Sequence, residues 1–200
     1  MIAKDGLIFI LPALFFAGLF WYFRLYIPFV FFLLLTISFL FFFRNPVRKI
    51  PELEKGEILS PADGKVIEIV KTDHGRRLSI FLALYNVHVF RAPEEGILKT
   101  VRLVRGKFHP AYKLEASTEN ERVKYVIEGE NRVEFDVIAG VAARRIKPWK
   151  GEGSEVQAGE LLGIVMFGSR TDIYIPDNFE LYVKEGDKVK GGLTKIGRFE

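Results

Sequence analysis

The Gly168-Ser169 pair is the first candidate for chemistry in this chain. A serine hydroxyl becomes a nucleophile when a base takes its proton, and it could attack the carbonyl of the residue before it. Gly168 tolerates backbone angles that other residues do not, so the bond between these residues could be strained by its neighbours. The alternative is an ordinary turn in a hairpin, because Gly-Ser pairs are common in turns.

Three histidines could supply a base, because histidine changes its charge near neutral pH. His88 lies among apolar and aromatic residues, where a hydrogen-bonded core histidine is the default expectation. His109 lies in a loop-like segment, and His74 lies in an exposed turn where we expect no function. Asp63 lies in Pro61-Ala62-Asp63-Gly64, where a plain turn former is the simplest interpretation.

Several kinds of chemistry are not indicated. The chain has no cysteine, which excludes disulfides, thiolate catalysis and cysteine-based metal sites. The spacing of His, Asp and Glu suggests no metal site, and no P-loop or dinucleotide fingerprint occurs. We therefore expect no metal.

The positive charge belongs to the N-terminal segment. Of 29 basic and 25 acidic residues, five basic and one acidic residue lie within residues 1–50, so the rest of the chain holds 24 of each. We therefore expect no nucleic-acid partner, because a basic surface is the mark of such proteins.

Two apolar runs at the N-terminus predict a membrane anchor at residues 1–45. The runs 7–23 and 25–43 are each near the roughly 20 residues that a spanning helix needs. Arg24 and nearby Trp and Tyr side chains suit a turn at the membrane surface. Basic residues at both outer ends (Lys4, Arg44, Arg48 and Lys49) would face the cytoplasm. One bent span or an interfacial helical pair is the alternative.

Residues 52–200 predict a mainly β domain, a small barrel or sandwich, because short alternating strands are separated by turns. The apolar run 161–166 predicts a strand before the Gly168-Ser169 break, and the alternation of Ile173 and Ile175 with Asp172 and Tyr174 predicts a second strand after it. Residues 123–127 and 133–137 predict a hairpin. Pro61-Ala62-Asp63-Gly64 predicts a second hairpin turn. Residues 152–159 and 185–192 repeat a Gly-turn-Val-x-x-Gly unit that resembles biotinyl and lipoyl domains.

Five motifs occur together in a fixed order, and as a set they resemble the phosphatidylserine decarboxylase family. They are Ser60-Pro61-Ala62-Asp63-Gly64, residues 86–93, residues 108–111 with Asn120-Glu121-Arg122, residues 142–146, and Phe167-Gly168-Ser169-Arg170. The resemblance covers about residues 44–182. It is nearest to the short form, which includes the archaeal archaetidylserine decarboxylases.

The resemblance implies that the chain cuts itself at 168/169 and turns Ser169 into a pyruvoyl group. That group is the implied cofactor, without pyridoxal phosphate, because the twenty side chains offer no electrophilic carbonyl as an electron sink. The implied activity is decarboxylation of a serine lipid, phosphatidylserine or archaetidylserine, to the ethanolamine lipid and carbon dioxide. The implied partners are the membrane lipid and the two chains of one precursor, and an oligomer is compatible with the sequence.

The resemblance also implies roles for individual residues. Asp63, His88 and Ser169 would form an Asp-His-Ser arrangement with the logic of a catalytic triad. Where larger members have His-x-x-His, this chain has His88 and then Arg91, and an arginine is a poor base. His109 is therefore the reserve base. His109, Arg91 and Arg144 are expected to bind substrate.

Two other classes of function stay open at this point. One is a membrane-anchored β-barrel scaffold without catalysis, which would need neither Ser169 nor His88. The other is a carrier domain with its cofactor on Lys65, although the Met-Lys setting of such carriers is absent.

Overall fold

A computed structural model of the chain describes residues 1–73, 75–113, 115–141, 145–166 and 169–200. His74 and Arg144, both singled out from the sequence, lie outside the described residues. The chain divides into two compact units, Met1–Val47 and Arg48–Glu200, which are described one at a time.

The first unit is a helical hairpin, as the two apolar runs predicted. A short 3-10 helix (Lys4–Gly6) leads into α1 (Leu7–Tyr22), and α2 (Tyr26–Phe42) returns alongside it. Arg24 lies at the turn with a positive φ of 56°. Aromatic rings join the helices, with Phe20 and Phe32 stacked at 5.5 Å. The segment Lys4–Tyr22 is 19 residues long and apolar enough to cross a membrane, whereas α2 has 17 residues.

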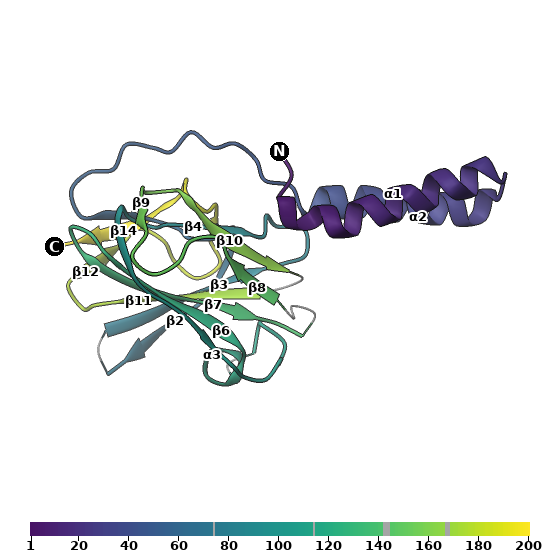
Figure 1. The fold of residues 1–200 in the computed structure, drawn as a ribbon. Coiled ribbons are helices and arrows are strands. Elements are labelled where there is room, and N and C mark those ends of the chain that lie inside the picture. The colour runs from purple at the N-terminus through teal and green to yellow at the C-terminus, as the bar shows by residue number, and fades with distance from the viewer. Residues whose placement is uncertain (74, 114, 142–144, 167–168) are drawn as a thin grey trace. The chain divides into compact units, whose positions relative to one another are not determined.

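The second unit is mainly β, as predicted (Figure 1). Its elements are β1 (Glu57–Leu59), β2 (Gly64–Thr72), β3 (Gly75–Leu82), β4 (Val89–Arg91), β5 (Gly96–Val104), α3 (Ala116–Glu119), β6 (Arg122–Glu128), β7 (Arg132–Ala139), β8 (Arg145–Pro148), β9 (Glu155–Val156), β10 (Leu161–Met166), β11 (Ser169–Ile175), β12 (Phe179–Leu181), β13 (Lys188–Val189) and β14 (Lys195–Phe199).

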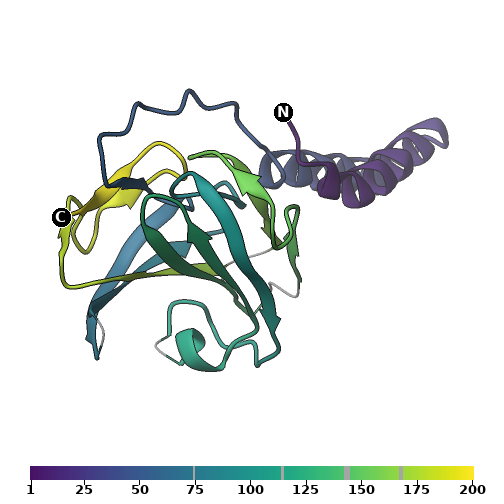
Figure 2. The same cartoon turned by 60° about the vertical axis from the view of Figure 1, so that its left-hand side comes forward.

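The strands form one large and two small antiparallel sheets, which makes the unit sandwich-like rather than a closed barrel. The large sheet has the order β13-β2-β3-β11-β7-β6-β5-β9, and the small sheets are β4-β10-β8 and β1-β14-β12. Residues of the large sheet and of both small sheets contribute side chains to the apolar core. Figure 2 shows the strands of the three sheets from a second side. Phe90 of β4 meets Tyr125 of β6 edge-on at 5.5 Å, and Tyr125 stacks on Phe135 at 5.0 Å.

The repeated Gly-turn units occupy equivalent places at the two ends of the large sheet. The first repeat supplies β9, which pairs with the start of β5, and the second supplies β13, which pairs with the start of β2. Each strand is preceded by a glycine with positive φ, Gly153 at 81° and Gly186 at 95°. Such angles favour glycine because it has no Cβ. Each repeat therefore closes one edge of the sheet with a two-residue strand.

One predicted hairpin is confirmed and another is wrong. β6 and β7 pair over Gly129, as the sequence indicated. The turn before Gly64 does not join paired strands, because Ile58 of β1 pairs with Gly197 and Val66 of β2 pairs with Ile80. At this turn the chain passes from a small sheet to the large one. The residues of the turn do not determine whether the strands on its two sides pair with each other.

Candidate active site

Ser169 begins β11, where the chain passes from a small sheet to the large one. β10 pairs with β4 and β8, whereas β11 pairs with β3 and β7. The strands on either side of Gly168-Ser169 therefore form no hairpin, and the ordinary-turn interpretation is wrong. Phe167 and Gly168 lie outside the described residues. Ser169 pairs with Leu82 on one side and Ala139 on the other, so both neighbouring strands hold its backbone.

The Ser169 hydroxyl is buried and lacks a hydrogen-bond partner among the described residues. The residue is 0% exposed. Ser169 alternates with Arg170, and its side of β11 continues through Thr171 to Ile173 in the apolar core. A buried hydroxyl without a partner costs about 1–3 kcal/mol. Such a hydroxyl calls for an explanation, and reactivity is one.

His88 is buried just before β4, next to the end of β10. Its carbonyl accepts a hydrogen bond from the Val165 N–H at 3.0 Å. Its ring Nδ1 lies 2.9 Å from the Asn86 carbonyl oxygen. Because a carbonyl can only accept, Nδ1 must carry the proton, and Nε2 then holds the lone pair of the neutral ring. The backbone of Asn86 thus sets which nitrogen of His88 can act as a base.

Asp63 is bound by Arg48, an arginine that follows the second apolar run in the sequence. Arg48 donates two hydrogen bonds to the Asp63 carboxylate, at 2.6 and 2.8 Å, and its side chain is only 6% exposed. The Gly191 N–H donates to the same carboxylate at 2.9 Å. Paired bonds of this kind are strong and directional. Arg48 was missed as a site residue because its position after an apolar run suggested a solvent-exposed basic flank.

His88 and Arg91 lie on opposite sides of β4. Side chains alternate along a strand, so His88 shares a side with Phe90, which packs in the core, and Arg91 points the other way. Arg91 donates to the Gly159 carbonyl at 2.8 Å. Burial lowers the pKa of Arg91, and the charge of Arg48 lowers it further, against the opposing effect of Asp63. Arg91 therefore belongs with Asp63 and cannot take the place of a second base beside His88.

His109 is tied to the Ser169 region through Asn120 and not through its own ring. The Asn120 side chain donates to the carbonyls of His109 and Ala139, at 2.8 and 2.7 Å, and accepts from the His109 N–H at 2.8 Å. Ala139 pairs directly with Ser169. The ring Nε2 of His109 lies 2.9 Å from a carboxylate oxygen of Glu119. In the sequence Asn120 is only one residue of a motif, and its bridging role is visible only in the structure.

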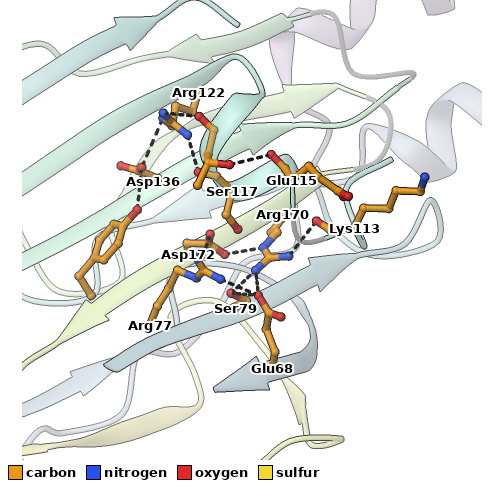
Figure 3. Close-up of polar contacts among 12 residues, drawn as sticks. Glu68, Arg77, Ser79, Lys113, Glu115, Ser117, Arg122, Asp136, Arg170 and Asp172 are labelled. Atoms are coloured by element: carbon orange, nitrogen blue, oxygen red, sulfur yellow. Dashed lines mark hydrogen bonds and ion pairs between the residues drawn. The ribbon is translucent and has the colours of Figure 1, made fainter. Parts of the chain in front are cut away.

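A buried cluster of charges lies on the other face of β11 (Figure 3). Arg170 and Asp172 are both 0% exposed, and the Arg170 Nε donates to Asp172 at 2.6 Å. Glu68 of β2 forms ion pairs with both Arg170 and Arg77 of β3. Burial opposes the charge of Glu68, but the hydrogen bond and charge of Arg170 outweigh it and hold the Glu68 pKa below its usual value.

Asp136 of β7 lies directly opposite Asp172 across the sheet. Burial raises the pKa of Asp136 to about 6, and the nearby Asp172 acts in the same direction. The Tyr174 hydroxyl donates to Asp136 at 3.1 Å, which partly offsets that rise. Asp136 should therefore change its charge between pH 5 and 7.

Replacing Asp136 with asparagine should stabilise the protein more at pH 8 than at pH 5. The folded pKa of Asp136 is raised, so its favourable contribution is complete below about pH 4 and is lost as the pH rises through about 6. The gain in the free energy of unfolding on replacing Asp136 should be larger at pH 8 than at pH 5 by on the order of 1–3 kcal/mol. Thermal melts across this range would measure it, with exposed Asp177→Asn as the control for net charge. A difference that is constant with pH would contradict the prediction.

Comparison with known proteins identifies a family for this chain. The family model described as phosphatidylserine decarboxylase matches residues 35–197. A protein named phosphatidylserine decarboxylase proenzyme from Streptomyces coelicolor is 43% identical over 166 residues, 82% of this chain and 74% of that protein. A protein of the same name from Carboxydothermus hydrogenoformans is 43% identical, over 84% of this chain and 82% of that protein. Another from Rhodopirellula baltica is 39% identical, over 92% of this chain and 79% of that protein.

The chain is thus a decarboxylase with a sandwich-like β unit. It belongs to the phosphatidylserine decarboxylase family, in its short form. Because this family consists of decarboxylases, we no longer interpret the chain as a scaffold or as a carrier domain. Lys65, the residue on which a carrier would depend, lies inside β2 between Phe81 and Lys188 and not at a hairpin tip.

Proposed function

We propose that this protein cleaves itself between Gly168 and Ser169, converts Ser169 into a pyruvoyl group, and decarboxylates a serine phospholipid at a membrane. The main support is Ser169 itself, which has a buried hydroxyl without a partner among the described residues, at the start of a strand held on both sides. The relatives are named proenzymes, which supports processing of a precursor.

Self-cleavage and ketone formation need only the chain's own atoms and one water molecule. The Ser169 Oγ attacks the Gly168 carbonyl carbon, and the peptide bond becomes an ester. Removal of the Ser169 Cα proton then expels the Gly168 carboxylate. The remaining double bond takes up water and loses ammonia, which leaves a ketone at the head of residues 169–200. That ketone is the electron sink that decarboxylation of an amino acid requires.

His88 is proposed to move protons in at least one of the two reactions. The Asn86 carbonyl orients its ring, so that Nε2 is the nitrogen that accepts or returns a proton. This carbonyl takes the orienting role that an aspartate has in a triad. Asp63 is proposed to act at a distance, by fixing Arg48 and the Gly191 backbone.

The substrate is proposed to be phosphatidylserine or archaetidylserine, which share the headgroup on which the reaction acts. Residues 1–45 are proposed to anchor the enzyme, and residues 52–200 to form the catalytic domain on the cytoplasmic side of the cell membrane. An anchor suits this substrate, because a phospholipid stays in the bilayer. His109, Arg91 and Arg144 are proposed to bind substrate, of which Arg91 already has Gly159 as a partner.

The test is the intact mass of the detergent-solubilised protein under denaturing conditions. Two fragments that meet at 168/169 are expected, and the smaller should be blocked by a carbonyl instead of a free serine amine. Decarboxylation of phosphatidylserine and archaetidylserine in mixed micelles follows as the second assay. A single uncut chain that still releases carbon dioxide would overturn the proposed cofactor, and an uncut inactive chain would overturn the function.

A further inference from the structure

Cleavage at 168/169 would leave Ser169 as a chain terminus, and chain termini are usually mobile. A reacting carbonyl at such a terminus needs a fixed position, because small misplacements of reacting groups are costly. The backbone of β11 helps, since Ser169 pairs with both Leu82 and Ala139. The side chain next to the terminus, Arg170, adds contacts that backbone pairing does not supply.

Arg170 is bound by four groups, three of which lie outside β11 (Figure 3). Its Nε donates to Asp172 Oδ1 at 2.6 Å, and its Nη2 donates to Ser79 Oγ at 2.6 Å and to Glu68. Its Nη1 donates to the Lys113 carbonyl at 3.3 Å. These partners come from β11, β3, β2 and the segment before α3. A planar guanidinium with several donors can satisfy them together, whereas a single ammonium cannot.

The neighbouring strands are shaped to provide these partners. Ser79 lies directly opposite Asp172 across β3 and β11. β2 has an irregular register between Val66 and Glu68, and Glu68 pairs with Ser79 beyond it. Bulges of this kind turn a side chain in a new direction. The cluster is therefore built from three strands around the one residue that follows Ser169.

We propose that Arg170 is a positioning residue that holds the pyruvoyl-bearing chain end in place after self-cleavage. This inference rests on the proposed function. Arg170 lies on the face of β11 opposite to Ser169, so it acts through the strand and touches no substrate. In the uncut chain the peptide bond to residue 168 restrains Ser169. After cleavage, Arg170 and its four partners replace that restraint.

The matched test compares Arg170→Lys with Arg77→Lys. Arg77 belongs to the same cluster, donating to Glu68 at 3.0 Å and lying 3.7 Å from Asp172, but it is not next to Ser169. Both changes keep the charge. We expect both variants to cleave themselves, and Arg170→Lys alone to lower kcat roughly 10- to 100-fold with little change in KM. Equal losses of kcat in the two variants, with equal shifts in Tm, would overturn the proposal in favour of a purely structural role.

Hydrogen exchange tests the same proposal by a measurement other than catalysis. Amides of residues 170–173 should exchange as slowly in the cleaved protein as in uncut Ser169→Ala, because the cluster persists. In cleaved Arg170→Lys they should exchange faster, and in Arg77→Lys they should not. Fast exchange in the cleaved wild type would overturn the positioning role, whereas a wild type that never cleaves would overturn the proposed function instead.

Discussion

Ser169→Ala is expected to remain a single uncut chain and to show no decarboxylation above the uncatalysed background. Alanine has no hydroxyl to attack the Gly168 carbonyl and cannot become a ketone, so both reactions lose their reacting atom. The fold should persist, because the change removes a buried hydroxyl that has no partner among the described residues. Intact mass, carbon dioxide release and a thermal melt of one preparation would measure all three expectations.

Thr171→Val is the matched control for this change. Thr171 is also 0% exposed, lies on the same side of β11 as Ser169, and has a buried hydroxyl without a partner among the described residues. Removing that hydroxyl should leave self-cleavage intact. If Ser169→Ala still yields two fragments or still decarboxylates lipid, the assignment of Ser169 is wrong. If Thr171→Val also stops cleavage, the effect reflects packing of β11 rather than the chemistry of Ser169.

His88→Ala is expected to lose at least one of the two reactions. General acid–base catalysis typically contributes 10²- to 10⁴-fold, so a loss of roughly that size is expected in cleavage, in decarboxylation, or in both. The two steps can be separated by measuring the fraction of cut chain first and then the rate per cut chain. Added imidazole should restore part of the lost rate, because the substitution leaves a space where a ring was buried.

His109→Ala should be measured beside it. The His109 ring is half-exposed and lies against Glu119, so its loss should weaken the rate far less than the loss of His88. A His88→Ala variant that cleaves and decarboxylates normally would contradict its role. Full loss in His109→Ala with normal His88→Ala would transfer the role of base to His109.

The N-terminal helical hairpin and the mainly β unit could be predicted from the sequence, since both depend on local periodicity. Long apolar runs predict helices, and strict alternation, as in Ile173 and Ile175 against Asp172 and Tyr174, predicts a strand with two unlike faces. The strands on either side of Ser169 followed from the same reasoning. So did the hairpin over Gly129.

The partners of the site residues could not be predicted in this way. Asp63 and Arg48 are separated by an extended segment, and nothing in the local pattern distinguishes Arg48 from a basic flank beside a membrane. Likewise, Pro61-Ala62-Asp63-Gly64 has the chemistry of a hairpin turn, yet its flanking strands join different sheets. Pairing between distant strands depends on the whole topology, which a short window of sequence does not contain.

The sequence by itself determined which residues are available: a Gly168-Ser169 bond between two strands, one histidine in an apolar setting, and two apolar runs at the N-terminus. Only the tertiary structure decided how they are used. In the folded protein Ser169 is buried where the chain passes from a small sheet to the large one, and Asp63 forms an ion pair with Arg48. Glu68, Ser79 and Asp172 lie around Arg170. The physical reason is that reactivity depends on burial, hydrogen bonding and charge, and residues distant in the chain supply all three.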